Sequence, residues 1–380
     1  MIKNRSMTLL FSIFLAACQT AAPAADAQPA PDTEATVAQA VEGTLAPSAT
    51  PVPVINPLTG LPVDDPALLE RRPVMVKVSN YPQYGRPHAG LSAADIVFDY
   101  YIGYGTNRFL ALYYGQDCDT IGPVRSGRFV DAQLVTMYSG VLAYGSADED
   151  TDLEINEKLG DYAISNLEAP EPAFVGTDTH SVVGVYANSA ALSDFVDQQG
   201  LENDKPDLPG MVFSYEIPDH GQYAEQVNIL FNYNNRGEWK YDKSSGKYLR
   251  WIEYFEDEED QTYDMIPLVD RNTGDQLGFS NVIIIFAEYT ELAPSRYLID
   301  IWGNDKGKKA YFFRDGQVFA GKWRAKNDSD PMQFFNDVGD PMALKPGNTW
   351  IVVASLDSTY EEIAPAVWEM FFYPPVAPED

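Results

Sequence analysis

The sequence is poor in the residues that disulfide scaffolds, metal centres and nucleic-acid surfaces require. Its 380 residues include two cysteines and three histidines, which excludes a disulfide framework and a cysteine-rich zinc or iron–sulfur site. Positive charge is also scarce, because 26 Lys and Arg stand against 56 Asp and Glu and give a formal net charge of −30. A chain of this charge repels the phosphates of nucleic acids and anionic lipids. We therefore expect no metal, no cofactor and no nucleic-acid partner.

The N-terminal segment lacks an apolar run long enough to cross a bilayer. Lys3 and Arg5 precede an apolar run over residues 7–17, whereas a membrane-spanning helix needs roughly 20 such residues. This layout is typical of a secretory signal peptide. The run ends in Leu-Ala-Ala before Cys18 and resembles the bacterial lipobox, in which the cysteine is lipidated and becomes the first mature residue. The alternative is an ordinary signal peptide cleaved nearby, or an uncleaved anchor.

Residues 19–54 lack aromatic residues, Lys and Arg, and contain 11 Ala and 6 Pro. Such a segment cannot bury enough apolar area to offset the conformational entropy lost on folding. We expect residues 1–17 to be a lipoprotein signal peptide and residues 18–55 to be the lipidated cysteine with a disordered tether. The alternative for the Ala-rich centre is a helix.

The chemistry changes from Asn56 onward, where β-branched and aromatic runs are bounded by Gly, Pro and Asn. These runs predict strands, and segments with helical spacing of apolar residues accompany them. The combination predicts an N-terminal α/β layered domain with a mixed sheet over residues 56–218. The expected strands are 73–80, 94–104, 107–115 and 140–147, and the expected helices are 127–139, 150–159 and 183–198.

Beyond about residue 220 the pattern changes to hairpins. Turn-forming residues separate alternating runs, and the Asp315-Gly316 turn between 310–313 and 317–323 is the clearest example. We expect a β-rich C-terminal domain over residues 219–358 and a C-terminal tail over residues 359–380. The fold class of the whole chain is therefore predicted to be α+β.

Several motifs in both halves resemble those of the YerB-like bacterial lipoproteins, a two-domain family of unknown function. The motifs include NPLTGL (56–61), IGPVRSGR (121–128), YFFRDGQVFAGKW (311–323) and LKPGNTWIVV (344–353). The resemblance covers roughly residues 56–355. It implies an α/β first domain, a β-rich second domain and an envelope location, but no established activity. The chain departs from the family pattern at Asp99, where Glu is usual, and around His180.

The segment 121–128 is the best candidate for a binding site. A Gly-Pro turn leads into a predicted helix start, where backbone N–H groups are free and Ser126 can cap them. Arg125 and Arg128 add two permanent positive charges, and Arg108 could supply a third. The helix dipole and the guanidinium groups both favour an anion. This pattern predicts a site for a phosphate or a carboxylate.

Two other interpretations remain open for these residues. The arginines could form ion pairs with Asp95, Asp99 or Asp131 and so fix the loop. His180, two residues after Asp178, could instead act as a general base together with Asp99. No Gly-x-Ser-x-Gly elbow, P-loop or His-Glu-x-x-His motif occurs in the sequence, so the common hydrolase and nucleotide-binding signatures are absent.

Together these features predict a palmitate-type, lipid-anchored protein on the extracytoplasmic face of the cell membrane. We expect a binding or scaffold protein rather than an enzyme, which recognises an anionic envelope component such as a cell-wall polymer, a peptide or an envelope protein. The alternative is a cell-envelope hydrolase or transferase with Asp99 and His180 as catalytic candidates and an Arg-lined anion pocket.

The lipid anchor is testable by changing Cys18 to Ser. The hydroxyl is a poor substitute for the lipidated thiol, so Cys18→Ser should leave an unprocessed precursor or release the protein from the membrane. Detergent phase partitioning and the mass of the mature N-terminus measure this outcome. A variant that still enters the detergent phase and is processed like the parent would contradict lipidation at Cys18.

Overall fold

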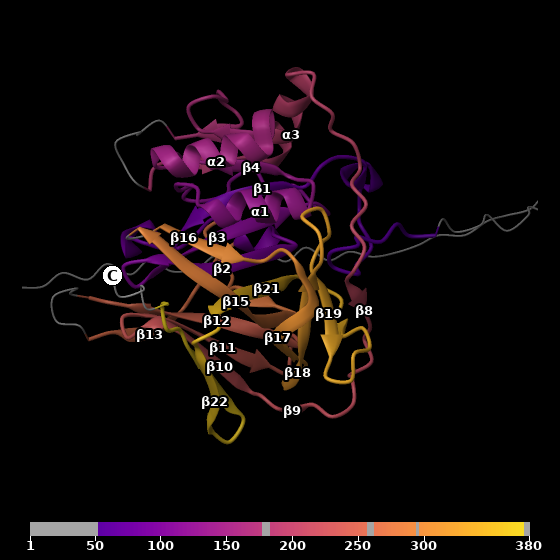
Figure 1. Ribbon diagram of the computed structural model, residues 1–380, viewed down its shortest axis with the longest axis vertical. Coiled ribbons are helices and arrows are strands. Elements are labelled where there is room, and N and C mark those ends of the chain that lie inside the picture. The colour runs from indigo at the N-terminus through magenta and orange to yellow at the C-terminus, as the bar shows by residue number, and fades with distance from the viewer. Residues whose placement is uncertain (1–51, 177–182, 257–261, 294–295, 376–380) are drawn as a thin grey trace, which may run out of the picture. The chain divides into compact units, whose positions relative to one another are not determined.

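The computed structural model describes residues 52–176, 183–256, 262–293 and 296–375. In this part of the chain there are three α-helices, and strands from both halves share one mixed twelve-stranded sheet (Figure 1). The helices are α1 (Phe129–Met137), α2 (Glu149–Leu159) and α3 (Ser189–Gln198). The strands of the large sheet are β1 (Val74–Ser79), β2 (Ile96–Gly103), β3 (Thr106–Tyr113), β4 (Val141–Tyr144), β5 (Ala163–Ser165), β9 (Gln222–Tyr223), β15 (Asn281–Ala293), β16 (Arg296–Asp300), β17 (Asn304–Arg314), β18 (Gln317–Ala325), β19 (Gln333–Asn336) and β21 (Thr349–Ser355).

The second sheet has seven strands, all from the second half of the chain. They are β10 (Gln226–Asn232), β11 (Asn235–Asp242), β12 (Lys247–Tyr254), β13 (Asp264–Pro267), β14 (Gly278–Phe279), β22 (Thr359–Ala364) and β23 (Val367–Phe371). Two small ladders complete the strands of the described residues, namely β6 (Phe174–Val175) with β7 (Tyr186–Ala187) and β8 (Val212–Phe213) with β20 (Ala343–Leu344).

The two halves of the chain meet where β2 pairs in parallel with β21. The strand order of the large sheet is β19-β18-β17-β15-β21-β2-β3-β1-β4-β5, so this pair lies at its centre. Ile96 lies opposite Thr349 and Tyr100 lies opposite Val353. Every residue of both strands is buried, as expected for parallel strands covered on both faces. The halves therefore form one compact unit.

The alternation of side chains along β2 gives the large sheet two different faces. On one face, Lys77 lies 3.0 Å from Asp131 of α1, and Tyr100 contacts the same carboxylate. The other face packs against the seven-stranded sheet, where the ring of Trp350 is 5.1 Å from that of Trp239. Successive residues of a strand point to opposite faces. Helix α1 and the second sheet thus cover opposite sides of the same strands.

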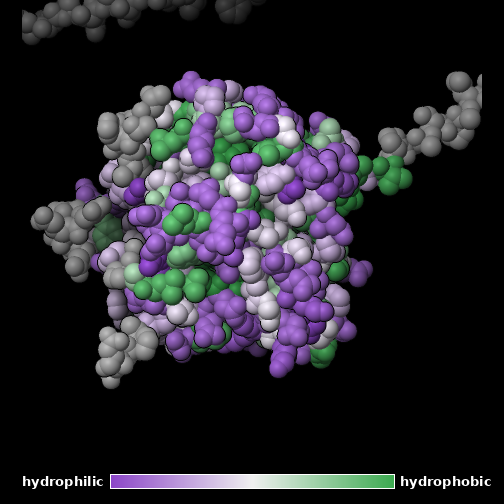
Figure 2. Space-filling view, turned by 45° about the horizontal axis from the view of Figure 1, so that its top comes forward, coloured by the Kyte–Doolittle hydropathy of each residue, from purple (hydrophilic) through white to green (hydrophobic). Residues whose placement is uncertain are grey.

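The α/β first half with a mixed sheet and the β-rich second half are confirmed. The predicted helix over 127–139 is shorter and begins at Phe129, and the one over 183–198 begins at Ser189. Asn188 causes the later start, because its side chain accepts a hydrogen bond from the Ala191 N–H and caps the helix. On the face shown in Figure 2, hydrophilic residues predominate and hydrophobic ones form small separate groups.

The region expected to be a C-terminal tail, 359–380, instead contains β22 and β23. Strand β23 pairs in parallel with β10, with Gln226 opposite Val367 and Leu230 opposite Phe371. Because Met370 is buried and Trp368 partly buried, this hairpin extends the second sheet rather than trailing from it.

Asp270 offers a test of how strongly the halves are coupled. This carboxylate is fully buried in the second half and accepts hydrogen bonds from Gly90 N–H at 2.9 Å and from Ser92 N–H at 2.8 Å in the first half. Asp270→Asn puts an amide NH₂ among these donors and should lower the free energy of unfolding by about 3 kcal/mol. Urea unfolding of the full chain measures this loss.

The matched control is Asp275→Asn, an exposed residue of the same loop that should change stability by about 0.5 kcal/mol or less. Equal stabilities of the two variants would show that Asp270 does not couple the halves.

Candidate functional site

Arg108 is held on the helix-covered face of the large sheet. On β3 it lies opposite Tyr100 of β2 and Ser79 of β1, so its side chain shares their face. Only 9% of the residue is exposed, and Nη1 donates a 2.6 Å hydrogen bond to the Ser126 carbonyl. The alternation of side chains along β3 therefore directs this guanidinium group to the helix-covered face, toward the loop that precedes α1.

Backbone hydrogen bonds fix that loop on both sides. The Arg125 N–H donates to the Lys77 carbonyl at 2.9 Å, and the Arg125 carbonyl accepts from the Gly145 N–H at 2.9 Å. The Gly127 N–H donates to the Ser146 carbonyl at 2.7 Å. Arg125 thus starts from a rigid backbone position, which lowers the entropy lost when its side chain binds a ligand.

The structure corrects the predicted helix cap. Arg128, not Ser126, is the N-cap of α1, and its N–H donates to the carboxylate of Asp131 in the first turn at 2.7 Å. The Ser126 hydroxyl instead lies 3.4 Å from the Ser146 hydroxyl. The shorter helix has the same cause, because Arg128 becomes its N-cap.

The three arginines lie close together, and none of them forms an ion pair with a carboxylate of the described residues, although the charge of Asp148 acts on Arg128. Among the described residues, the ion pairs do not include Arg108, Arg125 or Arg128. Burial, followed by the charges of the other two arginines, holds the pKa of Arg108 well below its usual range. The buried Nε atoms of Arg125 and Arg128 have no hydrogen-bond partner in the described part of the chain.

The carboxylates proposed as partners of these arginines have other contacts. Asp95 accepts from Asn56 and from two backbone N–H groups. Asp99 accepts from Asn107 and Trp350. Asp131 pairs with Lys77 at 3.0 Å. The structural ion-pairing interpretation is therefore not what the structure shows.

Lys77 adds a fourth basic group beneath the arginines. It is fully buried, with its Nζ next to the Tyr100 hydroxyl and the Asp131 carboxylate. The pKa of Lys77 is lowered to about 7, mainly by burial, which outweighs the raising effect of Asp131 and is reinforced by the charges of Arg108 and Arg128. The Asp131 carboxylate is therefore engaged by Lys77 and by the Arg128 backbone N–H.

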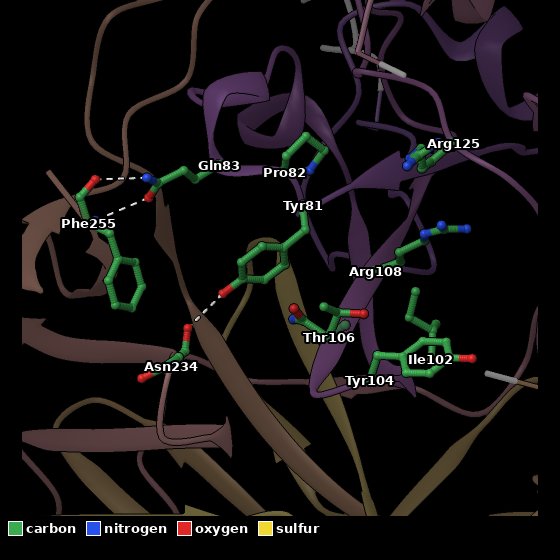
Figure 3. A pocket seen from close by; sticks show the side chains of 11 residues that line it. Tyr81, Pro82, Gln83, Ile102, Tyr104, Thr106, Arg108, Arg125, Asn234 and Phe255 are labelled. Atoms are coloured by element: carbon green, nitrogen blue, oxygen red, sulfur yellow. Dashed lines mark hydrogen bonds between the residues drawn. The ribbon is translucent and has the colours of Figure 1, made fainter. Parts of the chain in front are cut away.

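Arg108 and Arg125 line a cavity of about 510 Å³ at the end of the β2–β3 hairpin (Figure 3). Arg128 and Ser126 are not among its lining residues. Figure 3 shows the two arginines on one side of the cavity and Phe255 on the other, with Tyr81 between them. The complete lining is Tyr81, Pro82, Gln83, Ile102, Tyr104, Thr106, Asn107, Arg108, Arg125, Asn234 and Phe255.

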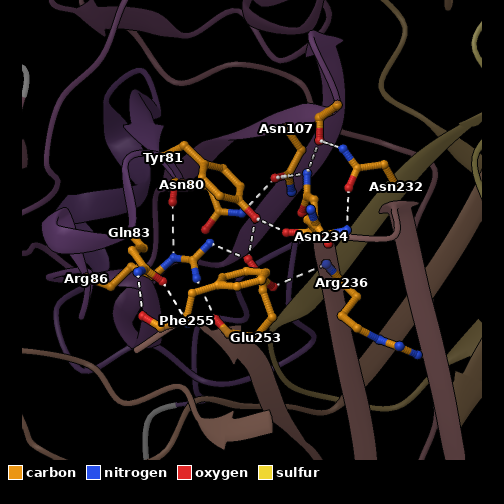
Figure 4. A network of polar contacts seen from close by, with 12 residues as sticks. Asn80, Tyr81, Gln83, Arg86, Asn107, Asn232, Asn234, Arg236, Glu253 and Phe255 are labelled. Atoms are coloured by element: carbon orange, nitrogen blue, oxygen red, sulfur yellow. Dashed lines mark hydrogen bonds and ion pairs between the residues drawn. The ribbon is translucent and has the colours of Figure 1, made fainter. Parts of the chain in front are cut away.

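Beside the cavity, a polar network joins the two halves (Figure 4). The Tyr81 hydroxyl contacts the carboxylate of Glu253, and Arg86 donates to the same carboxylate at 2.8 Å. Asn107 accepts from Asn80 at 2.6 Å. The backbone of Phe255 is held at both its N–H and its carbonyl by the Gln83 amide. These contacts give the aromatic side of the cavity a fixed geometry.

The two catalytic candidates are not brought together with the arginines. Asp99 precedes Tyr100 on β2 and therefore lies on the opposite face of the sheet from Arg108, where Asn107 donates to it at 2.5 Å and Trp350 at 3.2 Å. Burial raises the pKa of Asp99 to about 6. His180 lies outside the described residues.

Other reactive side chains have structural surroundings. His88 is buried against the ring of Phe109, and burial lowers its pKa to about 3, so it stays neutral near pH 7. Burial, with smaller contributions from Asp270 and Asp119, raises the pKa of the Cys118 thiol, in the direction expected for a non-nucleophilic cysteine. Within the described ranges, no group of three or more His, Cys, Asp or Glu side chains is placed to hold a metal ion.

The residues that the second half contributes to the cavity were not predicted from the sequence. Asn234 and Phe255 lie more than 100 residues from the arginines, and nothing in their local sequence marks them as neighbours of Arg108. Tyr104 could have been recognised from the sequence, because it lies between Gly103 and Gly105 in a tight turn, where a bulky residue is unusual.

Both halves match a two-domain family described as a protein of unknown function, DUF3048. Its N-terminal domain matches residues 58–202 and its C-terminal domain matches residues 227–351. The chain belongs to this family, and the predicted family resemblance is confirmed.

One relative is the Bacillus subtilis (strain 168) protein named "Putative lipoprotein YerB". It is 27% identical over 311 residues, which cover 80% of this chain and 87% of the relative. The crystal structure of the YerB protein from Bacillus subtilis matches with a TM-score of 0.65 at 26% identity, covering 79% of this chain and 96% of that one. None of the helices within the described ranges has the length and hydrophobicity needed to cross a membrane.

The buried Asp99 predicts a specific pH dependence. Its folded pKa of about 6 exceeds the unfolded value near 3.9, so the folded state retains a proton that the unfolded state loses between pH 4 and 6. The parent should therefore lose about 2 kcal/mol of stability relative to Asp99→Asn as the pH rises through this window. Urea unfolding of both proteins at several pH values measures the difference.

The control is Asp305→Asn, which removes an exposed carboxylate and should follow the parent across the same window. A stability difference between parent and Asp99→Asn that stays constant from pH 4 to 6 would contradict the raised pKa.

Proposed function

We propose that the chain is a lipid-anchored binding protein of the outer face of the cell membrane, and that Arg108 and Arg125 hold a phosphate or carboxylate group of its ligand. One observation carries this proposal: two guanidinium groups, those of Arg108 and Arg125, line one cavity and form no ion pair with any described carboxylate, in a chain of formal net charge −30. The lipid anchor rests on the signal peptide and Cys18, together with the name of the YerB relative.

An anion in the cavity would relieve a specific electrostatic cost. Like charges held close together repel one another, and partial burial strengthens that repulsion because water screens it less. A phosphate or carboxylate bound between Arg108 and Arg125 replaces this repulsion with charge-assisted hydrogen bonds, which guanidinium groups can make in pairs. Their fixed backbones mean that little reorganisation accompanies binding.

The position of the cavity suits a protein anchored at its N-terminus. The chain enters the folded unit at Asn56, whose amide donates to Asp95 at the start of β2. The cavity lies at the other end of this strand, at Ile102 and Tyr104. Eight residues of strand span about 25 Å, so the cavity and the entry of the chain lie at opposite ends of the sheet.

The alternative function, a cell-envelope hydrolase or transferase, has less support. It requires a general base beside the arginines, yet Asp99 lies across the sheet from them and is enclosed by Asn107 and Trp350. Lys77, the titratable group beneath the arginines, is fully buried and held by Asp131. A binding function makes no such demand.

The anion site is tested by Arg108→Lys and Arg125→Lys, which keep the charge but lose the planar fork. The full-length protein in detergent should melt at a higher temperature in inorganic phosphate than in chloride of equal ionic strength. Each variant should fold like the parent and bind phosphate roughly tenfold more weakly, because one charge-assisted hydrogen bond is lost. Acetate serves as the carboxylate probe.

The control is Arg324→Lys, an arginine of β18 outside the cavity that stacks on Phe335. It should keep the parent's response to phosphate. If the parent gains no stability from phosphate or acetate, or if Arg324→Lys loses the response equally, the anion site is wrong.

A further inference from the structure

We propose that this cavity takes a sugar that carries the anionic group, with the ring of Tyr104 as a stacking surface at its mouth. The inference rests on the anion site proposed above and adds the chemical class of the ligand. It starts from an anomaly in the turn between β2 and β3, and then from the side chains that face the same cavity.

Tyr104 occupies a backbone conformation that does not suit it. It and Gly105 are the two residues between β2 and β3, and both have positive φ, +53° and +71°. This is the pattern of a type I′ hairpin turn, for which Asn-Gly or Gly-Gly is strongly preferred. A tyrosine in this left-handed region is strained, because its Cβ lies too close to the following carbonyl oxygen. The fold would be better served by Asn at this position.

The side chain of Tyr104 contributes little to the stability of the fold. The residue is 78% exposed, so its ring contributes little buried apolar area. It nevertheless lines the cavity that contains Arg108 and Arg125. A strained, exposed aromatic residue at the mouth of a cavity indicates that the ring serves a ligand rather than the folded chain.

A second aromatic surface lines the same cavity and is rigid. Arg86 lies 4.7 Å from the centre of the Tyr81 ring, and the Tyr81 hydroxyl donates to the Asn234 carbonyl at 3.1 Å. The ring of Phe255 packs 5.6 Å from that of Tyr263. The cavity thus combines aromatic faces with a cationic end. Aromatic faces carry partial negative charge and attract the C–H groups of a sugar ring.

The remaining lining groups favour a hydroxyl-rich ring over a hydrocarbon chain. The Thr106 hydroxyl donates to the Gly103 carbonyl at 2.8 Å and can still accept a hydrogen bond. The exposed Asn234 side-chain amide has no hydrogen bond to another described residue and can both donate and accept. An alkyl chain would leave these groups unpaired, whereas sugar hydroxyls can satisfy them.

Size and charge limit the ligand further. The volume of about 510 Å³ lies within the range of about 300–1,000 Å³ that is usual for small-ligand sites. The acidic protein repels a densely charged polymer, but a neutral ring with one anionic group places its charge only at the arginines. A free sugar phosphate and an anionic residue of an envelope glycan share this chemistry.

The experiment compares four small probes with the full-length protein in detergent by titration calorimetry. Glucose 1-phosphate carries ring and anion, glycerol 1-phosphate carries the anion alone, glucose carries the ring alone, and inorganic phosphate is the reference. We expect glucose 1-phosphate to bind at least tenfold more tightly than glycerol 1-phosphate. A hyaluronan tetrasaccharide serves as the probe for a glycan that carries a carboxylate. Tighter binding of glucose 1-phosphate indicates a free sugar phosphate as the ligand, and tighter binding of the tetrasaccharide indicates an anionic residue of a glycan.

Tyr104→Asn is the decisive variant, because Asn suits the turn and the variant should melt at or above the temperature of the parent. In this variant the ratio of the affinity for glucose 1-phosphate to that for glycerol 1-phosphate should fall at least fivefold. Its affinity for inorganic phosphate should equal that of the parent. Tyr104→Phe, which keeps the ring, should restore most of the preference. Tyr215→Asn removes an exposed tyrosine outside the cavity and should behave like the parent.

The outcomes separate this inference from the anion site. If phosphate binds but glucose 1-phosphate and glycerol 1-phosphate bind equally well, or if Tyr104→Asn keeps the preference, the sugar inference is wrong and the anion site stands. If none of the anionic probes binds to the parent, both proposals fall.

Discussion

The parallel pairing of β2 with β21 is the contact on which the arrangement of the candidate site depends. It places strands from the two ends of the chain side by side, with Asp99 opposite Val352, and so brings the seven-stranded sheet under one face of β2. That docking brings Asn234 and Phe255 to the same cavity as Arg108. A cavity with a cationic side from the first half and an aromatic side from both halves therefore exists only when the halves share a sheet.

The same contact separates charges across the sheet. On the face toward the second sheet, Glu253 forms an ion pair with Arg86. Arg250 is buried on the same face. Burial lowers the pKa of Arg250, and the nearby charges of Asp99 and Glu253 partly offset this effect. Buried ions of this kind need partners, since an unpaired buried charge is strongly destabilising. On the helix-covered face Asp131 pairs with Lys77, and Arg108 and Arg125 form no ion pair with any carboxylate in the described part of the chain. Their positive charge is thus available to a ligand.

Local patterns in the sequence predicted most elements but not how they meet. The Asp315-Gly316 hairpin is confirmed, since both residues have positive φ between β17 and β18, and the apolar runs of β1 to β3 are strands. The β2–β21 pairing joins residues about 250 positions apart, and no local pattern encodes such a contact. In the site, the scarcity of positive charge in the sequence indicated the arginines. The face of the sheet on which Asp99 lies depends on the strand register, which no local pattern gives. Phe255 reaches the cavity only because the two sheets pack together.

The charge of the whole chain and that of the cavity act on a ligand over different distances. At physiological ionic strength, exposed charges are screened beyond about 8 Å. The acidic surface therefore repels those parts of a ligand that come within this distance of it, whereas Arg108 and Arg125 attract the anionic group that they contact. Added salt weakens both the repulsion by the acidic surface and the attraction by the arginines. Because these two effects oppose each other, the affinity for the ligand should depend on salt less than it does at an anion site on a basic protein. A long polyanion extends over the acidic surface and gains repulsion with each unit, while a compact ligand with one anionic group does not. The site therefore selects by charge distribution as well as by charge.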